Sequence, residues 1–246
     1  MMTDTAMKIS EDTLSILKNF STLNSNIYIK PGNKIRTITP AKNVMGEANV
    51  SETFENEIGI FDLSKFLGTI SLFNDPEFVF EEKFVLISGR GGSEVKYYYT
   101  EPSLLTHDDR EIGMPDPVVN FSVSDKQLSE IQKASAVLQL PNISFEAKDG
   151  EIHMVAFEKP GHDYTGSGYD AGSNTYTVVL GNNDTGAGYE YHFNIENLRI
   201  LPGSYDVSLS DKVISKMTHT SGLDLSYWIA FSPSSKYHGC TSFSLC

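Results

Sequence analysis

The six histidines are the residue type best suited to proton transfer or metal binding near neutral pH. They are spread widely along the chain, without the short spacing of metal ligands. Most fall in predicted loops or alternate along predicted strands. We therefore predict that they are structural or solvated residues and that the chain has no metal site. The residues are His107, His153, His162, His192, His219 and His238.

Other patterns that carry enzyme chemistry are weak here. Gly166–Ala171 matches the glycine pattern of a dinucleotide-binding loop, but no predicted helix opens from it and no parallel βαβ unit surrounds it. No serine lies in a nucleophile elbow. Glu52, Glu55 and Glu57 have a spacing that is typical of the solvated face of a strand. A glycosidase pair stays open, because separation in space defines it.

The two cysteines, Cys240 and Cys246, lie within the last seven residues of the sequence. A disulfide between them would close a very small loop and would staple no other part of the fold. Their spacing does not suit zinc either. We interpret both as incidental thiols, and we expect a protein that is not an enzyme and needs no cofactor.

Basic residues on the predicted helices form a more informative pattern. Lys18 and Lys65 lie opposite the apolar stripes of their helices, and Lys126 and Lys133 share one face that points away from Leu128, Ile131 and Leu138. The helices and their flanks hold six basic and six acidic residues, and five of the six acids are in first turns. This pattern indicates either ordinary solvated faces or a surface that tolerates phosphate. The basic residues are Lys8, Lys18, Lys65, Lys126, Lys133 and Arg199.

The elements that would carry these residues occur twice in the same order. Each half has two helices, which begin at Ser10 and Asp62 in the first half and at Ser124 and Ile195 in the second. The second helices are predicted to run to Phe73 and Leu201. Strands are predicted at 26–30, 34–39, 54–61, 77–81, 83–88 and 93–100, and again at 118–123, 142–148, 151–157, 189–193, 205–209, 212–217 and 223–231.

Domain boundaries follow from this repeat. The first helices are 114 residues apart and the second helices 133, and the extra residues fall in the Gly- and Tyr-rich stretch 160–188. We interpret 161–172 and 181–188 as outer loops of an insertion, and the polar, Pro-punctuated stretch 101–117 as a linker. The prediction is an α+β chain of two related domains, 1–113 and 114–246 with a short C-terminal tail. Each domain is an antiparallel sheet with two helices on one face.

Composition limits the function. The chain has 246 residues, of which 39% are hydrophobic, and its 19 basic and 32 acidic residues give a net charge of −13. This balance excludes a protein that holds nucleic acid through a broadly basic surface, although not one with basic residues in one place. No stretch is long and apolar enough to span a membrane, and Met1–Ala6 lacks the features of a signal peptide. We expect a soluble cytoplasmic protein.

Several segments resemble the sliding clamp of T4-type bacteriophages, within the wider processivity-clamp fold. The resemblance spans nearly the whole chain in order and is densest in residues 7–75. It depends on fold-bearing residues rather than on a catalytic signature. The segments are Met7–Ser10, Asp12-Thr13, Leu17–Phe20, Asn24-Ser25, Glu47–Ser51, Ile60–Leu63, Phe66–Gly68, Ser71-Leu72, Asn194, Asn197, Pro202-Gly203 and Tyr205.

This resemblance implies a homotrimer of two-domain subunits, closed as a ring around duplex DNA, with the helices lining the hole. The six basic residues from Lys8 to Arg199 would then face the DNA and contact phosphates without reading sequence. Implied partners are duplex DNA, the phage DNA polymerase, an ATP-dependent clamp loader and late-transcription factors, but no membrane. The implied location is the cytoplasm of the infected bacterial host. Residues 1–6 and 240–246 have no counterpart in the family pattern.

Two other classes of protein compete with this interpretation. A β-rich, acidic chain also suits an oligomeric phage structural protein of the tail or capsid. The Tyr-rich loops around Tyr164, Tyr169 and Tyr176, with many carboxylates, suit a carbohydrate-binding or hydrolytic β-protein. The doubled, helix-containing repeat favours the clamp.

Overall fold

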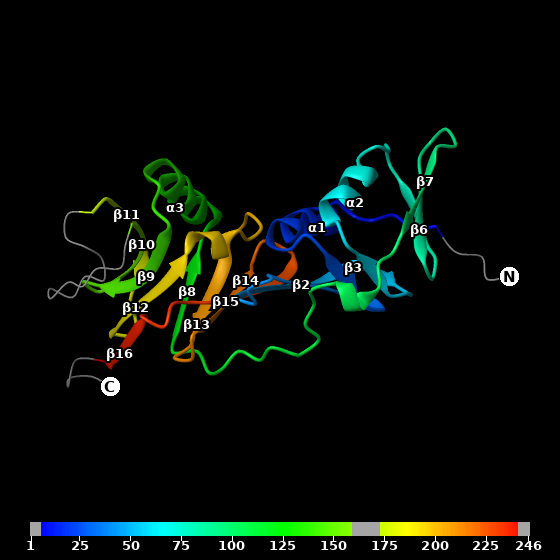
Figure 1. Cartoon of the computed structure of the whole chain (residues 1–246). Coiled ribbons are helices and arrows are strands. Elements are labelled where there is room, and N and C mark those ends of the chain that lie inside the picture. Colours follow the sequence, from blue (N-terminus) through cyan, green and yellow to red (C-terminus); the bar gives the residue numbers. More distant parts are fainter. Residues whose placement is uncertain (1–5, 159–172, 241–246) are drawn as a thin grey trace. The chain divides into compact units, whose positions relative to one another are not determined.

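The structure is a computed structural model that describes residues 6–158 and 173–240 (Figure 1). The described chain divides into two compact units. The first contains the residues up to Glu111 together with Leu223–Tyr227, and the second contains Ile112–Gly222 and the residues from Trp228 onward. The stretch 161–172, predicted as an outer loop, lies outside the described residues.

The first unit contains two α-helices and several short antiparallel sheets. β1 pairs with β4, β2 with β3, and β5 with β6 and then β7. The first residues of β15 (Asp224–Ala230) lie beside β3 in this unit. Its elements are α1 (Glu11–Leu23), β1 (Ile27–Ile29), β2 (Gly32–Ile38), β3 (Val44–Phe54), β4 (Ile58–Ile60), α2 (Leu63–Ile70), β5 (Glu77–Phe80), β6 (Phe84–Ser88), β7 (Glu94–Tyr98) and the 3-10 helix η1 (Pro102–Leu104).

The second unit repeats the pairing pattern. β9 pairs with β12 as β1 does with β4, and β10 pairs with β11 as β2 does with β3. One sheet has the order β11-β10-β9-β12-β16, and in the other the end of β15 is followed by β14, β13 and β8. The elements are β8 (Val119–Val123), α3 (Asp125–Leu138), β9 (Asn142–Lys148), β10 (Glu151–Phe157), β11 (Thr175–Asn182), β12 (Ala187–Asn194), the 3-10 helix η2 (Ile195–Leu198), β13 (Tyr205–Leu209), β14 (Ile214–His219) and β16 (Lys236–Cys240).

Helix α1 shows how the helices are fixed to the strands. Ile16, Leu17 and Phe20 recur at helical spacing and are buried. Phe20 packs so closely on β3 that a Cβ added to Gly46 would lie 2.7 Å from its ring. The Tyr227 hydroxyl donates a hydrogen bond to Asn19 at 2.6 Å. In Figure 1, α1 and α2 lie together on one side of the strands of their unit.

The predicted α+β class and the beginnings of the first three helices are confirmed. The side chains of Ser10, Asp62 and Ser124 cap α1, α2 and α3, and Ser124 forms a capping box with Gln127. The strands predicted over 142–148 and 151–157 are also confirmed as β9 and β10, which pair along their full length as a hairpin around Asp149-Gly150.

The predicted fourth helix, from Ile195 to Leu201, is wrong. The chain forms only the short 3-10 helix η2, and Arg199 already leaves helical geometry with φ −75° and ψ 50°. Pro202 disfavours helical geometry at Leu201, which removes a second turn. Gly203 follows with φ +153°, and a Cβ there would lie 2.2 Å from His219 Nε2. The chain therefore turns sharply where the prediction continued a helix.

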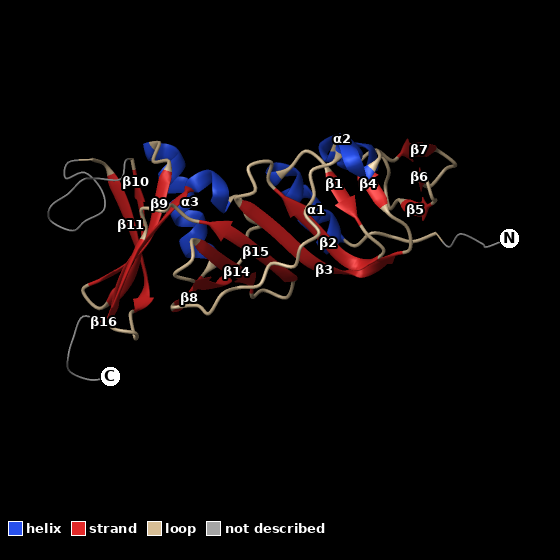
Figure 2. Ribbon diagram, turned by 60° about the horizontal axis from the view of Figure 1, so that its bottom comes forward, coloured by secondary structure: helices blue, strands red, loops and turns tan. Residues whose placement is uncertain are grey.

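Three strands were missed or misplaced. β3 ends at Phe54, whereas a strand was predicted over 54–61, of which β4 holds 58–60. The predicted loop 181–188 is strand at both ends, because β11 continues to Asn182 and β12 begins at Ala187. β16 was not predicted, and it includes Cys240, assigned to the tail. Figure 2 shows β3 as a long strand of the first unit.

Within the described residues, no helix is long and apolar enough to cross a membrane.

Candidate nucleic-acid interface

Two helices of the first unit present lysines on their solvent faces. Lys18 is exposed on α1, and Lys65 is exposed on α2, whose buried side is formed by Leu63, Phe66 and Ile70. The Asp62 side chain accepts a hydrogen bond from the Lys65 backbone N–H at 2.8 Å, which fixes the first turn of α2. Both lysines therefore point away from the core, as their spacing predicts.

Helix α3 presents a second pair of lysines in the second unit. Lys126 and Lys133 are exposed, and Leu128 and Ile131 are buried on the opposite side. Leu138, predicted as part of this buried stripe, is 40% exposed. The polar side chains between the lysines hold α3 to its neighbours. Gln127 donates to the Val179 carbonyl of β11, and Gln132 donates to the Leu198 carbonyl of η2, each at 2.9 Å.

Two of the six predicted basic residues are neutralised by carboxylates. Lys8 Nζ lies 2.5 Å from Asp75 Oδ1, and Arg199, the residue after η2, pairs with Glu196 of that short helix. Lys18, Lys65, Lys126 and Lys133 form no ion pair within the described part of the chain. Of the six predicted basic residues, four therefore form no ion pair in the described chain. The other two, Lys8 and Arg199, are masked, which means that a carboxylate neutralises their charge.

A surface hollow of about 280 Å³ brings two of these residues together in the first unit. Lys8 and Lys18 both line it, with Asp75 and Glu11 as the acidic members and with Leu14, Leu67 and Ile70 among its apolar members. Asp75 lies 67 residues from Lys8 in the sequence. Sequence spacing alone therefore gave no signal for this carboxylate.

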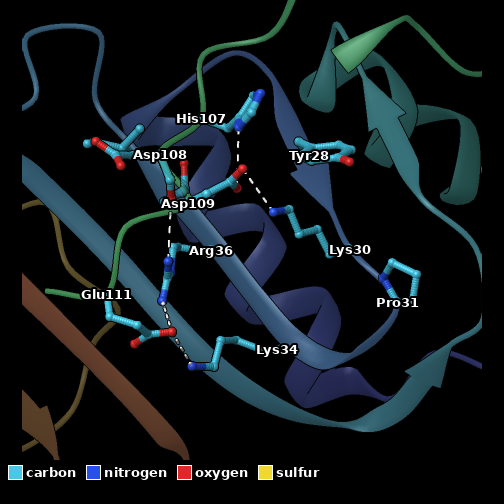
Figure 3. Close-up of a pocket in the computed structure, with 11 residues that line it drawn as sticks. Tyr28, Lys30, Pro31, Lys34, Arg36, His107, Asp108, Asp109 and Glu111 are labelled. Carbon is cyan, nitrogen blue, oxygen red and sulfur yellow. Dashed lines mark hydrogen bonds and ion pairs between the residues drawn. The ribbon is translucent and has the colours of Figure 1, made fainter. Parts of the chain in front are cut away.

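Basic residues on the strands of the same unit are engaged differently, by the linker (Figure 3). Lys30 Nζ lies 2.9 Å from Asp109, and Lys34 Nζ lies 3.5 Å from Glu111. Arg36 donates to the carbonyls of Asp108 and Arg110 at 3.4 and 3.2 Å. These groups surround a cavity of about 310 Å³. The linker carboxylates thus pair with Lys30 and Lys34, and Glu47 of β3 pairs with both Lys34 and Arg36. These cations are therefore poor candidates for phosphate contact.

The histidines and carboxylates show no catalytic arrangement in the described residues. His192 and His219 are buried, and His192 Nε2 lies 2.5 Å from Glu190. No group of three or more metal-ligating side chains occurs in the described ranges. The prediction that Glu52 is solvated is wrong, because it is only 6% exposed and accepts hydrogen bonds from Ser10 N–H and the Thr13 hydroxyl, both at 2.5 Å.

Comparison with solved structures defines the class of fold. The structure of the PCNA2–PCNA3 complex from Sulfolobus tokodaii superposes with a TM-score of 0.66 over 92% of this chain and 98% of that one. The sequences are 13% identical, so this likeness concerns the fold alone. The chain has the processivity-clamp fold, as the resemblance in its sequence implied.

Sequence comparisons give the family. Residues 120–232 match the family described as gp45 sliding clamp, C terminal, and residues 10–81 match DNA polymerase processivity factor. The sliding clamp of Vibrio phage KVP40 is 29% identical over 91% of this chain and 98% of its own length. The sliding clamp of Enterobacteria phage T4 is 28% identical over 82% of this chain and 87% of its own. The chain belongs to the sliding-clamp family of T4-type phages.

Proposed function

We propose that copies of this chain close into a homotrimeric ring around duplex DNA and hold the phage DNA polymerase on its template. In this role the protein is not an enzyme, since the ring acts by topology and by binding partners. The observation that carries the proposal is a set of four exposed helix lysines that form no ion pair with any described residue, in a chain of net charge −13. A few such groups give weak phosphate contacts that permit sliding, and the acidic remainder repels DNA from other surfaces.

Two sheet edges support head-to-tail closure. β7 is the outer strand of the three-stranded sheet in the first unit, and β11 is the outer strand of the five-stranded sheet in the second. Each edge carries an exposed apolar residue, with Tyr98 64% exposed and Val179 49% exposed. An uncovered, apolar strand edge promotes pairing with another chain, and two different edges generate a closed ring by heterologous contact. We infer that β7 of one subunit meets β11 of its neighbour.

Sedimentation tests the ring. We expect a trimer at tens of micromolar, and we expect Tyr98→Asp and Val179→Asp each to shift it toward monomer with unchanged circular dichroism. Leu72→Asp is the matched control, because Leu72 is 74% exposed but lies outside both edges. A wild-type monomer, or edge variants that sediment like the control, would contradict this assembly.

Charge reversal tests the DNA-facing assignment. Lys→Glu at Lys18, Lys65, Lys126 and Lys133 changes the subunit charge from −13 to −21. Exposed sites usually change stability by less than about 0.5 kcal/mol, so this variant should fold and trimerise. We expect it to lose processive synthesis, most severely at low salt, where screening is weakest.

The matched control for this experiment reverses Lys42, Lys83, Lys148 and Lys212. All four are exposed on loops and strand ends, and the net charge changes identically. We expect near-normal processivity. Equal processivity of the two variants across a salt series would contradict the assignment of the four helix lysines to the DNA-facing surface of the ring. A phage structural protein would then become the better interpretation.

The remaining partners follow from the ring. A closed ring has to be opened to admit DNA, so we include an ATP-dependent clamp loader in the proposal, acting in the cytoplasm of the infected host. Late-transcription factors are included in the proposal as partners only because the family resemblance implies them. We also retain the division into domains 1–113 and 114–246. Loader-dependent retention on circular DNA, with release after linearisation, is the expected signature of topological binding.

A further inference from the structure

Asp75 binds two cations at once. It lies in the turn after α2, with Oδ1 2.5 Å from Lys8 Nζ and Oδ2 2.9 Å from Arg90 Nη2. Lys8 comes from the N-terminal segment and Arg90 from the turn between β6 and β7. One carboxylate thus joins segments that are distant in sequence and leaves this three-residue cluster with a net charge of +1.

The backbone of Asp75 suits this role. Its φ is +54°, in the left-handed region that aspartate and asparagine tolerate better than other non-glycine residues. The hydrogen bond from Lys8 lowers the pKa of Asp75, and Arg90 lowers it further. The carboxylate therefore stays ionised at neutral pH and keeps both cations masked.

Asp75 also shares its surroundings with an unmasked cation. The hollow that holds Lys8 and Asp75 is lined by Lys18, which no carboxylate of the described chain pairs. The Lys8, Asp75 and Arg90 side chains are about half or more exposed to solvent. Ion pairs at such exposure contribute little to stability, and a DNA phosphate can therefore compete with Asp75 for the two cations.

We propose that Asp75 acts as an internal competitor of DNA phosphates, which limits how tightly the first unit grips DNA. This inference rests on the proposed function of the helix lysines. A ring that bound phosphates through every cation would slide slowly, because each further contact strengthens binding in a sequence-independent way. By occupying Lys8 and Arg90, Asp75 leaves Lys18 as the unmasked cation of the hollow.

Asp75→Asn tests this role. Asparagine keeps the shape and the left-handed backbone but releases both cations. We expect the trimer to bind a short duplex about threefold to tenfold more tightly at 0.1 M salt, with a salt dependence steeper by about 0.9 in log–log slope for each added phosphate contact. Fluorescence anisotropy over a salt series measures both quantities. Lys8→Gln in the Asp75→Asn background should reverse much of the gain.

Asp109→Asn is the matched control, because it also removes one negative charge and releases a lysine, Lys30, from a 2.9 Å ion pair. It should leave duplex binding within about twofold of the wild type. Equal gains from the two variants would mean that net charge alone sets affinity, and the role of Asp75 would be wrong. An unchanged Asp75→Asn variant would overturn the inference but not the function, provided that reversal of the four helix lysines abolishes duplex binding. If that reversal also has no effect, the proposed function itself fails.

Discussion

Helices α1 and α3 begin the same repeat in the two units but are anchored by different means. In the first unit, Glu52 of β3 accepts hydrogen bonds from Ser10 N–H and the Thr13 hydroxyl, so a strand residue holds the N-terminus of α1. In the second unit, the capping box of Ser124 and Gln127 holds α3 largely by local contacts. The anchor of α1 is a buried carboxylate that is distant in the sequence. The anchor of α3 is formed by residues adjacent in the sequence and can be predicted from them.

The difference shows what each anchor adds. A carboxylate at a helix N-terminus satisfies unpaired N–H groups and interacts favourably with the helix dipole. Because Glu52 lies on β3, it also ties α1 to the strand on which Phe20 packs. The capping box stabilises α3 through neutral side chains, although the Gln127 amide also donates to the Val179 carbonyl of β11. We therefore expect the first unit to depend more strongly on one titratable residue than the second.

Glu52→Gln is the prediction with the largest expected effect on stability. Glutamine keeps the size but presents an amide to donors that need an acceptor, and hydrogen bonds to charged groups contribute about 1.5–3 kcal/mol each. We expect a loss of at least 2 kcal/mol in the free energy of unfolding, measured in urea. Glu55→Gln, at an exposed site close by, should change it by less than about 0.5 kcal/mol.

The pH dependence of this effect has a definite sign. Burial on its own raises the pKa of Glu52, but the hydrogen bonds from Ser10 and Thr13 outweigh burial and lower that pKa below its ordinary value of 4.5. The folded state therefore favours the ionised form. Its stabilisation is complete above pH 4.5 and is lost as the pH falls below that value. The difference between wild type and Glu52→Gln should narrow over that acid range, and a constant difference would contradict this account.

Glu52 also shows where prediction from sequence reached its limit. The repeat, the α+β class and the N-caps of the three α-helices followed from local patterns. β3 did not, because Gly46 and Glu52 occupy buried positions of the strand where its alternation would place apolar side chains. β11 occupies the same position of the repeat, as the partner of β10, and was hidden by the glycine-rich residues on either side. β3 and β11 thus correspond in the repeat, and the hypothesis of an insertion over 160–188 led to the interpretation of part of β11 as a loop.

The candidate site was predictable to a similar extent. Helical spacing placed Lys18, Lys65, Lys126 and Lys133 on exposed faces. The partner of Arg199 is three residues away, at Glu196, and was within reach of local reasoning. The partner of Lys8 was not, because Asp75 meets it only when the chain folds. A surface cation can be neutralised by a carboxylate that is distant in the sequence. Helical periodicity shows which face a cation lies on but does not show such a partner.

Ser124→Ala should have the second largest effect on the free energy of unfolding. Loss of a serine N-cap costs about 1 kcal/mol, and here the 2.6 Å hydrogen bond that the Ser124 hydroxyl donates to Gln127 Oε1 is lost as well. Ser10→Ala should cost less, because Glu52 still binds the Ser10 N–H and Thr13. Both costs should be independent of pH between 6 and 8. Equal losses in thermal unfolding would show that the strand anchor of α1 adds nothing beyond its own cap.

The smallest expected effect is on duplex binding, and it compares α2 with its counterpart η2. The stretch from Leu63 to Ile70 has a complete apolar stripe and forms a helix, whereas η2 buries only Leu198 before Pro202 ends the possibility of a second turn. Lys65 therefore presents an unpaired charge, whereas Arg199 and Glu196 form an exposed pair of net charge zero.

Phosphate binding should follow this difference in charge. We expect Lys65→Gln to weaken duplex binding by a few-fold at low salt and to reduce the log–log salt slope by about 0.9 if one phosphate contact is lost. The double variant Arg199→Gln/Glu196→Gln should bind DNA like the wild type, because it removes a neutral pair. Since the isolated Arg199→Gln change would leave Glu196 facing DNA uncompensated, only the double variant makes a fair comparison. If it weakens binding as much as Lys65→Gln does, Arg199 contacts phosphate despite its partner, and masking by a neighbouring carboxylate does not govern which cations of this clamp meet DNA.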